Sequence, residues 1–177
     1  ASEGDRVQVR VIRLVPSQII NEEETAVLKV GRSGVDSDVS QDVIKLSVVE
    51  RYGKNGNVGT GFVKGFHITK GAMAYSMSHD HHNIVVTGVN ESDMAQAVLE
   101  VSRLHGGLAV VCDGRVLASM ELPIGGLMSE KGPDEVEKEL DGLNEAARML
   151  GCSVDAPFMA LSFISLPTVP QLGLTDK

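Results

Sequence analysis

The sequence has no tryptophan and few other aromatic side chains. Aromatic residues make up 3% of its 177 residues, as two Tyr and four Phe. A core must therefore be built mainly from Val, Ile, Leu, Ala and Met. The hydrophobic fraction of 42% is ordinary for a globular protein, and the length suits one sizeable domain or one domain with an appended piece of a neighbour.

Basic residues are also scarce, with 16 Lys and Arg against 24 Asp and Glu and a formal net charge of -8. Proteins that bind nucleic acid or anionic lipid surfaces use basic patches, so this balance argues against both kinds of partner. No apolar run approaches the roughly 20 residues that span a bilayer, and the acidic start does not look like a signal peptide. We therefore expect no nucleic-acid partner and no membrane.

Cysteine is limited to Cys112 and Cys152, which form no C-x-x-C pair. A reduced, cytoplasmic setting is the simplest interpretation. Neither cysteine has a histidine beside it in sequence, so a cysteine nucleophile is unsupported. The sequence also lacks the G-x-S-x-G elbow of hydrolases, the P-loop motif and the H-x-E with P-C-x-x-C signature of zinc nucleobase deaminases.

Hydrophobic periodicity predicts an α/β (α+β) fold: a mixed β-sheet with strand-strand-helix units and the helices packed on the sheet. Two helices are expected, at 91–105 with Asn90 as N-cap and at 134–150 with Leu140 on the buried face. The glycine-rich stretch 53–61 is expected to be a loop, and a Pro-containing tail follows the last strand. The predicted strands are 6–15, 25–30, 43–51, 71–76, 84–87, 108–112, 116–120 and 158–165.

Three of the five histidines fall in one turn between two predicted strands, within Ser78-His79-Asp80-His81-His82-Asn83. Imidazole and carboxylate groups can carry protons near neutral pH or bind a divalent metal. The opposing interpretation is a turn whose Asp80 and Asn83 bond the local backbone while exposed histidines do nothing. A metal site would need a third or fourth ligand, and none lies nearby in sequence; His67 and Glu50 could supply one only through the fold. Because apolar strands anchor the turn, we expect its side chains to point outward.

A second polar stretch, Gly59-Thr60-Gly61 with Gly65, has the spacing G-x-G-x-x-x-G. A dinucleotide fingerprint needs a different spacing and an amphipathic helix directly after it, and no such helix follows here. A flexible or closely packed loop is the better interpretation.

Several short motifs follow one another in a specific order along the chain. They are Val49-Glu50-Arg51, Gly61-Phe62-Val63-Lys64-Gly65-Phe66, Ser78-His79-Asp80-x-His82-Asn83-Ile84, Asn90-x-x-Asp93-Met94-Ala95, Pro123-Ile124-x-Gly126-Leu127-Met128-Ser129, Gly151-Cys152, Asp155-x-Pro157-Phe158-Met159 and Leu161-Ser162-Phe163. From about Val7 to the C-terminus, this series resembles the C-terminal domain of adenine deaminases, a family of the amidohydrolase superfamily.

The resemblance implies a parent enzyme of adenine catabolism and purine salvage that hydrolyses adenine to hypoxanthine and ammonia. In that family Mn²⁺ or Fe²⁺ lies at the mouth of a (β/α)8 barrel, the usual place for a barrel active site. The barrel and its H-x-H ligands are missing from this sequence. We therefore expect no metal and no confirmed catalytic residue in this chain, and no activity from it alone.

The resemblance also implies an organisation and partners. Residues 1–30 are expected to be strands of a small β-subdomain adjoining the missing barrel, 31–42 a linker, and 43–177 the C-terminal domain. The partners would be the N-terminal amidohydrolase barrel of the same protein and adenine, with a homo-oligomer left open. His79, Asp80 and His82 become candidate accessory residues, with Ser78 and Asn83 on a substrate-side loop toward the barrel mouth.

Two other interpretations remain open. The chain could be a stand-alone small-ligand or metal-binding module without catalytic activity. It could also be a structural oligomerisation domain, which is compatible with its being an accessory domain of an adenine deaminase. The start at Ala1, without an initiator methionine and almost directly before a predicted strand, suggests a piece cut from a larger sheet. A self-contained module should pair that strand fully within itself.

Overall fold

The structure, a computed structural model, describes residues 2–168 and 171–177. Within these residues the chain forms nine strands, three α-helices and a short 3₁₀ helix, Val39–Gln41. The strands are β1 Arg6–Leu14, β2 Asn21–Gly31, β3 Gly34–Val35, β4 Val43–Val49, β5 Val58–Lys64, β6 Ala72–Tyr75, β7 Ile84–Gly88, β8 Gly107–Cys112 and β9 Arg115–Glu121. The helices are α1 Glu91–Arg103, α2 Pro133–Met149 and α3 Pro157–Ile164.

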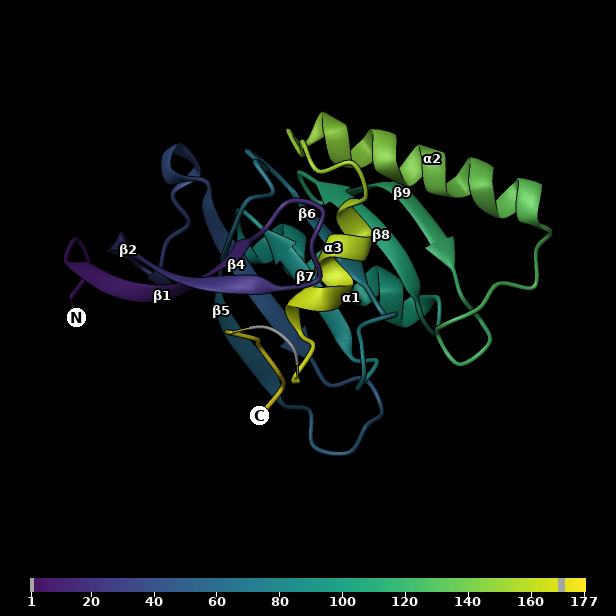
Figure 1. Cartoon of the computed structure of the whole chain (residues 1–177), viewed down its shortest axis with the longest axis horizontal. Coiled ribbons are helices and arrows are strands. Elements are labelled where there is room, and N and C mark those ends of the chain that lie inside the picture. The colour runs from purple at the N-terminus through teal and green to yellow at the C-terminus, as the bar shows by residue number, and fades with distance from the viewer. Residues whose placement is uncertain (1, 169–170) are drawn as a thin grey trace.

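All the strands belong to one twisted sheet in the order β3-β2-β1-β5-β4-β7-β6-β8-β9 (Figure 1). Every neighbouring pair is antiparallel except β1 and β5, which run parallel and pair at Ile12–Val63 and Arg13–Lys64. The predicted mixed sheet is therefore confirmed. Consecutive strands form the antiparallel pairs β1–β2, β2–β3, β4–β5, β6–β7 and β8–β9, whereas β4–β7 and β6–β8 pair strands that are not consecutive in the chain.

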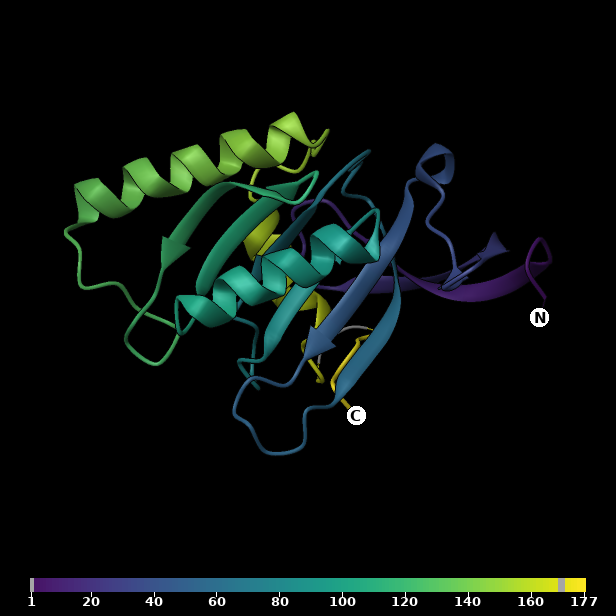
Figure 2. The same ribbon diagram turned by 180° about the vertical axis from the view of Figure 1, so that it is seen from behind.

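The helices cover both faces of the sheet. Helix α1 packs on one face, whereas α2 and α3 lie on the other (Figures 1 and 2). Successive residues of β6 illustrate the division: Ala72 and Ala74 are buried with α1, whereas Met73 and Tyr75 join the larger core beneath α2 and α3. This alternation follows from the two-residue side-chain period of a strand.

The strand-strand-helix unit occurs twice, as β6-β7-α1 and β8-β9-α2, as the periodicity predicts. Asn90 caps α1 as expected, because its side-chain oxygen accepts from the backbone N–H of Asp93 at 2.8 Å. The Asp93 carboxylate in turn accepts from the backbone N–H of Gly114 at 2.8 Å, in the β8–β9 turn. The cap therefore ties the start of α1 to the second unit.

The prediction of a final strand at 158–165 is wrong, because the segment forms helix α3. Pro157 occupies the first helical position, where its fixed φ favours a helix. Phe158, Leu161 and Ile164 are buried while Met159 is 52% exposed, which is the three-to-four residue period of a helix. A short apolar run cannot be assigned to strand or helix by periodicity alone.

Two further details differ from expectation. The stretch expected as a loop at 53–61 ends in a strand, since β5 begins at Val58. A Cβ at Gly59 would lie 1.9 Å from the carbonyl oxygen of Thr175, so this glycine lets the C-terminal tail approach β5. Close packing therefore accounts for this glycine. Of the predicted tail, Val169 and Pro170 lie outside the described residues.

Leu140 was expected to be buried, and it is only half-buried at the edge of the main core. Leu143 and Leu150, further along α2, are fully buried. The N-terminal half of α2 extends past the edge strand β9 (Figure 1), so it has less sheet beneath it. The helical period identified the right face, but not how far the sheet extends under it.

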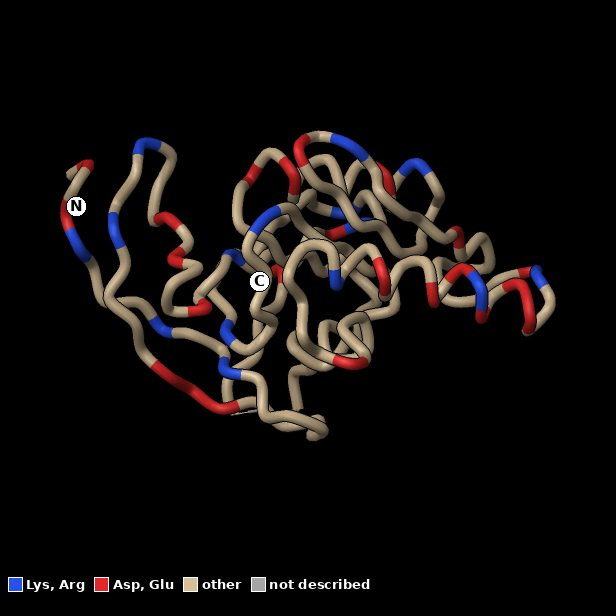
Figure 3. Tube along the Cα trace, turned by 90° about the horizontal axis from the view of Figure 1, so that it is seen from above, with Lys and Arg blue, Asp and Glu red and all other residues tan. Residues whose placement is uncertain are grey.

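The N-terminal strands β1 and β2 form a long antiparallel ribbon that leaves the main body of the sheet (Figure 1). Residues 31–42, expected as a linker, carry β3 and the 3₁₀ helix. Lys and Arg residues are scattered over the described chain, whereas Glu22, Glu23 and Glu24 form an acidic run on β2 (Figure 3). No helix among the described residues is long and apolar enough to cross a membrane.

Candidate functional site

Three loops meet at one end of the sheet. The turn Ser78–Asn83 joins β6 to β7, the segment 50–57 joins β4 to β5, and the segment 122–132 follows β9. Strand order places β4, β7, β6, β8 and β9 side by side. Because these strands are antiparallel, the connections that leave β4, β6 and β9 lie at the same end.

The turn is held by its own hydrogen bonds. The Ser78 hydroxyl donates to the carbonyl oxygen of Asn83 at 2.6 Å, and both residues are buried. The backbone N–H of Asn83 donates to Nδ1 of His81 at 3.1 Å. Nδ1 therefore acts as acceptor and Nε2 carries the proton, which points to the Ser165 carbonyl oxygen at 3.3 Å.

His81 is consequently a structural member of the turn. Partial burial lowers the pKa of His81, and the Ser165 carbonyl and the nearby Asp176 and Asp80 carboxylates only partly oppose this effect. The neutral imidazole is the form that can accept from Asn83. Sequence reasoning had left His81 out of the candidate residues, and its role depends on Ser165, 84 positions away.

The structure brings His79 and His82 together. Their ring centroids are 6.3 Å apart, and the His79 ring also lies 5.5 Å from the ring of Phe163 on α3. His82 has a φ of 52°, in the left-handed region, and its backbone N–H donates to the Ser78 carbonyl oxygen at 2.8 Å. Nδ1 of His82 is buried without a hydrogen-bond partner among the described residues.

Asp80 does not join this pair, because it is exposed at the tip of the turn. His79 and His82 are half-buried, while Ser78 and Asn83 are buried. The expectation that the side chains of the turn point outward is therefore correct for Asp80 alone. The turn packs against α3 instead, since the backbone N–H of His79 lies 3.3 Å from the Ser162 carbonyl oxygen.

Arg51 connects the turn to the other two loops. Its Nε donates to the His82 carbonyl oxygen at 2.6 Å, and a terminal nitrogen donates to the carbonyl oxygen of Gly125. Its guanidinium carbon lies 4.8 Å from the centroid of the Tyr52 ring, within the range of a cation–π contact. One side chain therefore links three segments that are far apart in sequence.

Glycine permits the close approach of the third loop. A Cβ at Gly126 would lie 2.6 Å from the Arg51 guanidinium, and Gly126 has a φ of 75°. The Gly126 carbonyl oxygen accepts from the Ser76 hydroxyl at 2.7 Å, and that hydroxyl accepts from the backbone N–H of Gly107 at 2.8 Å. A side chain at Gly126 would therefore displace Arg51.

Glu50 organises the neighbouring loop. Its carboxylate accepts from the backbone N–H groups of four residues in the segment that it precedes: Tyr52, Lys54, Asn55 and Gly56. Desolvation works against ionisation, but the four N–H groups together outweigh it and lower the pKa of the Glu50 carboxyl. Glu50 is thus committed to the loop.

The structure does not assemble a metal centre around the turn. The Glu50 carboxylate accepts hydrogen bonds from the backbone of its own loop, and Nδ1 of His67 lies 3.2 Å from the Asp42 carboxylate. In the residues that the structure describes, no three His, Cys, Asp or Glu side chains form a group that could hold a metal ion. The candidate site therefore consists of the imidazoles of His79 and His82, the guanidinium of Arg51 and the hydrogen-bonded turn Ser78–Asn83.

Sequence reasoning missed the part that Arg51 plays. Its partners His82 and Gly125 are 31 and 74 positions away, so no local pattern reveals them. The available signal was that Arg51, the turn and Gly126 each belong to a separate motif in the same ordered series.

The fold and this end of the sheet define an α+β domain that presents a histidine-containing turn, held by arginine, on a mixed sheet. Residues 18–177 match the family model described as adenine deaminase C-terminal domain. The chain therefore belongs to the adenine deaminase C-terminal domain family.

Curated relatives are consistent with this assignment. The chain is 54% identical over 175 residues to a protein of Desulforamulus reducens and 48% identical over 170 residues to one of Methanococcoides burtonii, both named adenine deaminase. A Dehalococcoides mccartyi protein of the same name is 40% identical over 176 residues. These alignments cover 99%, 96% and 99% of this chain but 30%, 29% and 31% of the relatives. The chain thus spans less than a third of their length, and the interpretation as a stand-alone module is not favoured.

Proposed function

We propose that this chain is the C-terminal domain of an adenine deaminase that hydrolyses adenine to hypoxanthine and ammonia, a reaction at a C–N bond of a cyclic amidine. In that reaction water adds at the amino-bearing ring carbon, and the amino group leaves as ammonia. The residues that carry out this step belong, in our proposal, to an N-terminal amidohydrolase barrel of the same polypeptide. The similarity to relatives named adenine deaminase supports the proposal.

The turn Ser78–Asn83 is proposed to lie toward the mouth of that barrel, on the substrate side. The observation that carries this proposal is the junction made by Arg51, which brings the turn together with the segments 50–57 and 122–132. Residues on loops held by a rigid sheet are well placed for function. His79 and His82 would orient the substrate or exchange a proton with it, with Asp80 accessory, while Ser78 and Asn83 maintain the turn.

A divalent metal, Mn²⁺ or Fe²⁺, is proposed for the barrel, where it would lower the pKa of water and polarise the substrate. The residues described here do not fit such an ion, because they contain no group of three possible ligands. No residue of this chain is therefore assigned to the metal. By the same reasoning, the isolated chain is proposed to be inactive.

The organisation of the parent is part of the proposal. Residues 1–30 would adjoin the barrel through the β1–β2 ribbon, with 31–42 as the connection to 43–177. We also place the protein in the cytoplasm, where thiols stay reduced. The free state of the buried Cys112 and Cys152 agrees with that setting.

The proposal is tested by His82→Asn in the full-length protein. Asparagine tolerates the left-handed backbone of position 82, so the change removes the imidazole with little strain. Orienting and acid–base roles typically contribute about 10²–10⁴-fold in rate. We expect kcat/KM for adenine to fall by at least about tenfold, with little change in the midpoint of thermal unfolding.

His105→Asn is a matched control, because His105 also has a left-handed φ, of 58°, and is exposed in the connection after α1. It should leave kcat/KM unchanged. If His82→Asn lowers the unfolding midpoint but the folded enzyme keeps normal kinetics, the turn is only structural and the proposed role of His82 is wrong.

A further inference from the structure

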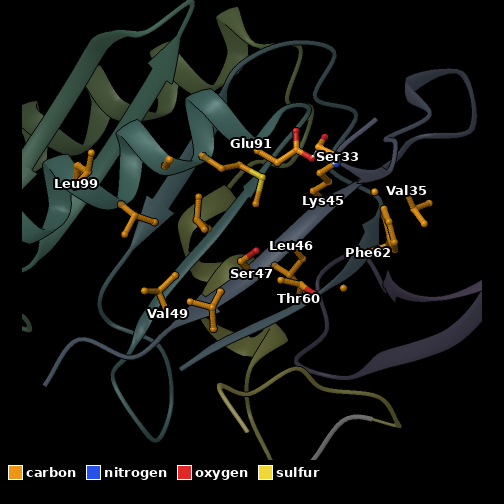
Figure 4. A pocket seen from close by; sticks show the side chains of 17 residues that line it. Ser33, Val35, Lys45, Leu46, Ser47, Val49, Thr60, Phe62, Glu91 and Leu99 are labelled. Carbon is orange, nitrogen blue, oxygen red and sulfur yellow. Dashed lines mark hydrogen bonds and ion pairs between the residues drawn. The ribbon is translucent and has the colours of Figure 1, made fainter. Parts of the chain in front are cut away.

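An apolar groove with a volume of about 690 Å³ lies on the α1 face of the sheet (Figure 4). Its floor is formed by side chains of β4 and β5 on the α1 face of the sheet, including Val49, Val58 and Phe62. One wall is α1, with Val98 and Leu99, and the opposite rim is the β2–β3 turn. Helix α1 packs on β6, β7, β8 and β9, so β4 and β5 continue beyond its cover.

The groove exposes large apolar side chains. Leu99 is 62% exposed and Val58 is 53% exposed, and both line it. Polar groups gather at one end, where Lys45 pairs with Glu91 and Ser33 also contacts Glu91 (Figure 4). An apolar surface with a polar end is typical of a site that another element covers.

The shape of the site favours a helix as the occupant. Strand β4 is hydrogen-bonded on both edges, to β5 and to β7, so this part of the floor offers side chains and no free backbone partners. A helix satisfies its own backbone hydrogen bonds and needs only an apolar stripe. A helix lying beside α1 would cover β4 and β5 in the way that α1 covers β6 and β7.

The path of the chain indicates which polypeptide could supply this helix. The backbone N–H of Gly4 donates to the Val30 carbonyl oxygen at 2.8 Å, and Val30 pairs with Val35, which lines the groove. Gly4 therefore lies beside the rim of the groove, and polypeptide joined before Ala1 would start close to it. The relatives are more than three times as long as the aligned region, so they have ample chain to fill it.

We propose that the groove is the docking site for an amphipathic helix from the polypeptide that precedes Ala1 in the full-length protein. The inference rests on the proposed function only in that this chain is the C-terminal part of a longer protein. The apolar face of the helix would contact Val58, Phe62 and Leu99, and its polar face would meet the Lys45–Glu91 pair at the groove's end.

Thiol labelling tests the proposal. Leu99→Cys is prepared in the 177-residue chain and in the full-length protein, and its rate of reaction with a maleimide is measured in each. Met149→Cys is the control, because Met149 is 60% exposed on α2, outside the groove. The native Cys112 and Cys152 are buried, which raises the pKa of both thiols and keeps their background reaction slow.

We expect Leu99→Cys to react on the order of tenfold or more slowly in the full-length protein than in the 177-residue chain, as protection by a covering element requires. Met149→Cys should react equally in both. Val58→Cys, on the floor of the groove, should follow Leu99→Cys. The proposal would be overturned if Leu99→Cys reacted at the same rate in the full-length protein as in the 177-residue chain, and Val58→Cys did so too.

A second copy of the chain is the alternative occupant. It would protect Leu99→Cys in the 177-residue chain itself, increasingly so at higher protein concentration, and this result would also overturn the proposal. The test is independent of adenine deamination. If the full-length protein is active but Leu99→Cys reacts freely in it, only the docking of a helix in the groove is refuted. If Leu99→Cys is protected but the His82→Asn variant is fully active, only the proposed role of the turn is refuted.

Discussion

The Nε atom of Arg51 donates a hydrogen bond to the backbone carbonyl oxygen of His82 at 2.6 Å. Because the same guanidinium also donates to the Gly125 carbonyl oxygen, the position of the turn depends on a residue of another loop. The charge of Arg51 strengthens both bonds, since charge-assisted hydrogen bonds contribute more than neutral ones.

Arg51→Met should therefore destabilise the isolated chain. It removes charge-assisted bonds to two backbone carbonyls, and we expect the free energy of unfolding in urea to fall by about 1–3 kcal/mol. Arg148→Met is the control, because Arg148 pairs with Glu145 on the exposed surface of α2 and its loss should cost less than about 0.5 kcal/mol. Equal losses for the two variants would show that the Arg51 junction contributes nothing of its own.

The isolated 177-residue chain should release no ammonia from adenine, with or without added Mn²⁺ or Fe²⁺. The chain spans about 30% of the relatives named adenine deaminase, and the described residues hold no group of three possible metal ligands. An ammonia assay on the purified chain checks this, with a His79→Ala variant as the reference. Release above that reference would place catalytic residues in this domain.

Leucines on the same face of α2 should differ in importance. Leu143 is fully buried, so Leu143→Ala should lower the free energy of unfolding by roughly 2–5 kcal/mol. Leu140 is half-buried near the edge of the sheet, and Leu140→Ala should cost about 1 kcal/mol. Chemical denaturation of both variants measures the difference. A larger loss at Leu140 than at Leu143 would contradict the position of α2 on β9.

The stability of the isolated chain should depend on pH through His81. Partial burial lowers the pKa of His81 in the folded state, so below about pH 6.5 the unfolded chain binds more protons than the folded one. The contribution of neutral His81 is therefore present above the unfolded pKa and is lost as pH falls toward the folded pKa. Protonation would also remove the acceptor that Nδ1 offers to Asn83.

Free energies of unfolding measured between pH 5 and pH 7 should thus decline less steeply with falling pH in His81→Gln than in the unaltered chain. The carboxylates facing His81, those of Asp80 and Asp176, favour its protonation and limit the size of the effect. His67→Gln serves as the control, since His67 is exposed beside Asp42. An unchanged slope in His81→Gln would show that the burial of this ring has no energetic consequence.

Local pattern was sufficient for the regular parts of the fold. The periods of most strands and of helices α1 and α2, and the Asn90 cap, are set by residues close together in sequence, so two strand-strand-helix units could be predicted. The same pattern located the histidines in one turn between β6 and β7. Segment 158–165 was predicted incorrectly as a strand because its short apolar run fits either period until neighbouring layers bury one side of it.

The sequence by itself thus determined helices α1 and α2 and most of the strands, the family to which the motifs point, and where the histidines lie. The tertiary structure alone decided what those histidines contact, how deeply Leu140 is buried and which face of the sheet remains open. The physical reason is the separation along the sequence over which each kind of interaction acts. Periodicity and caps act over a few residues, whereas the bond from Arg51 to His82, the bond from His81 to Ser165 and the uncovered floor of β4 and β5 exist only after distant segments pack together.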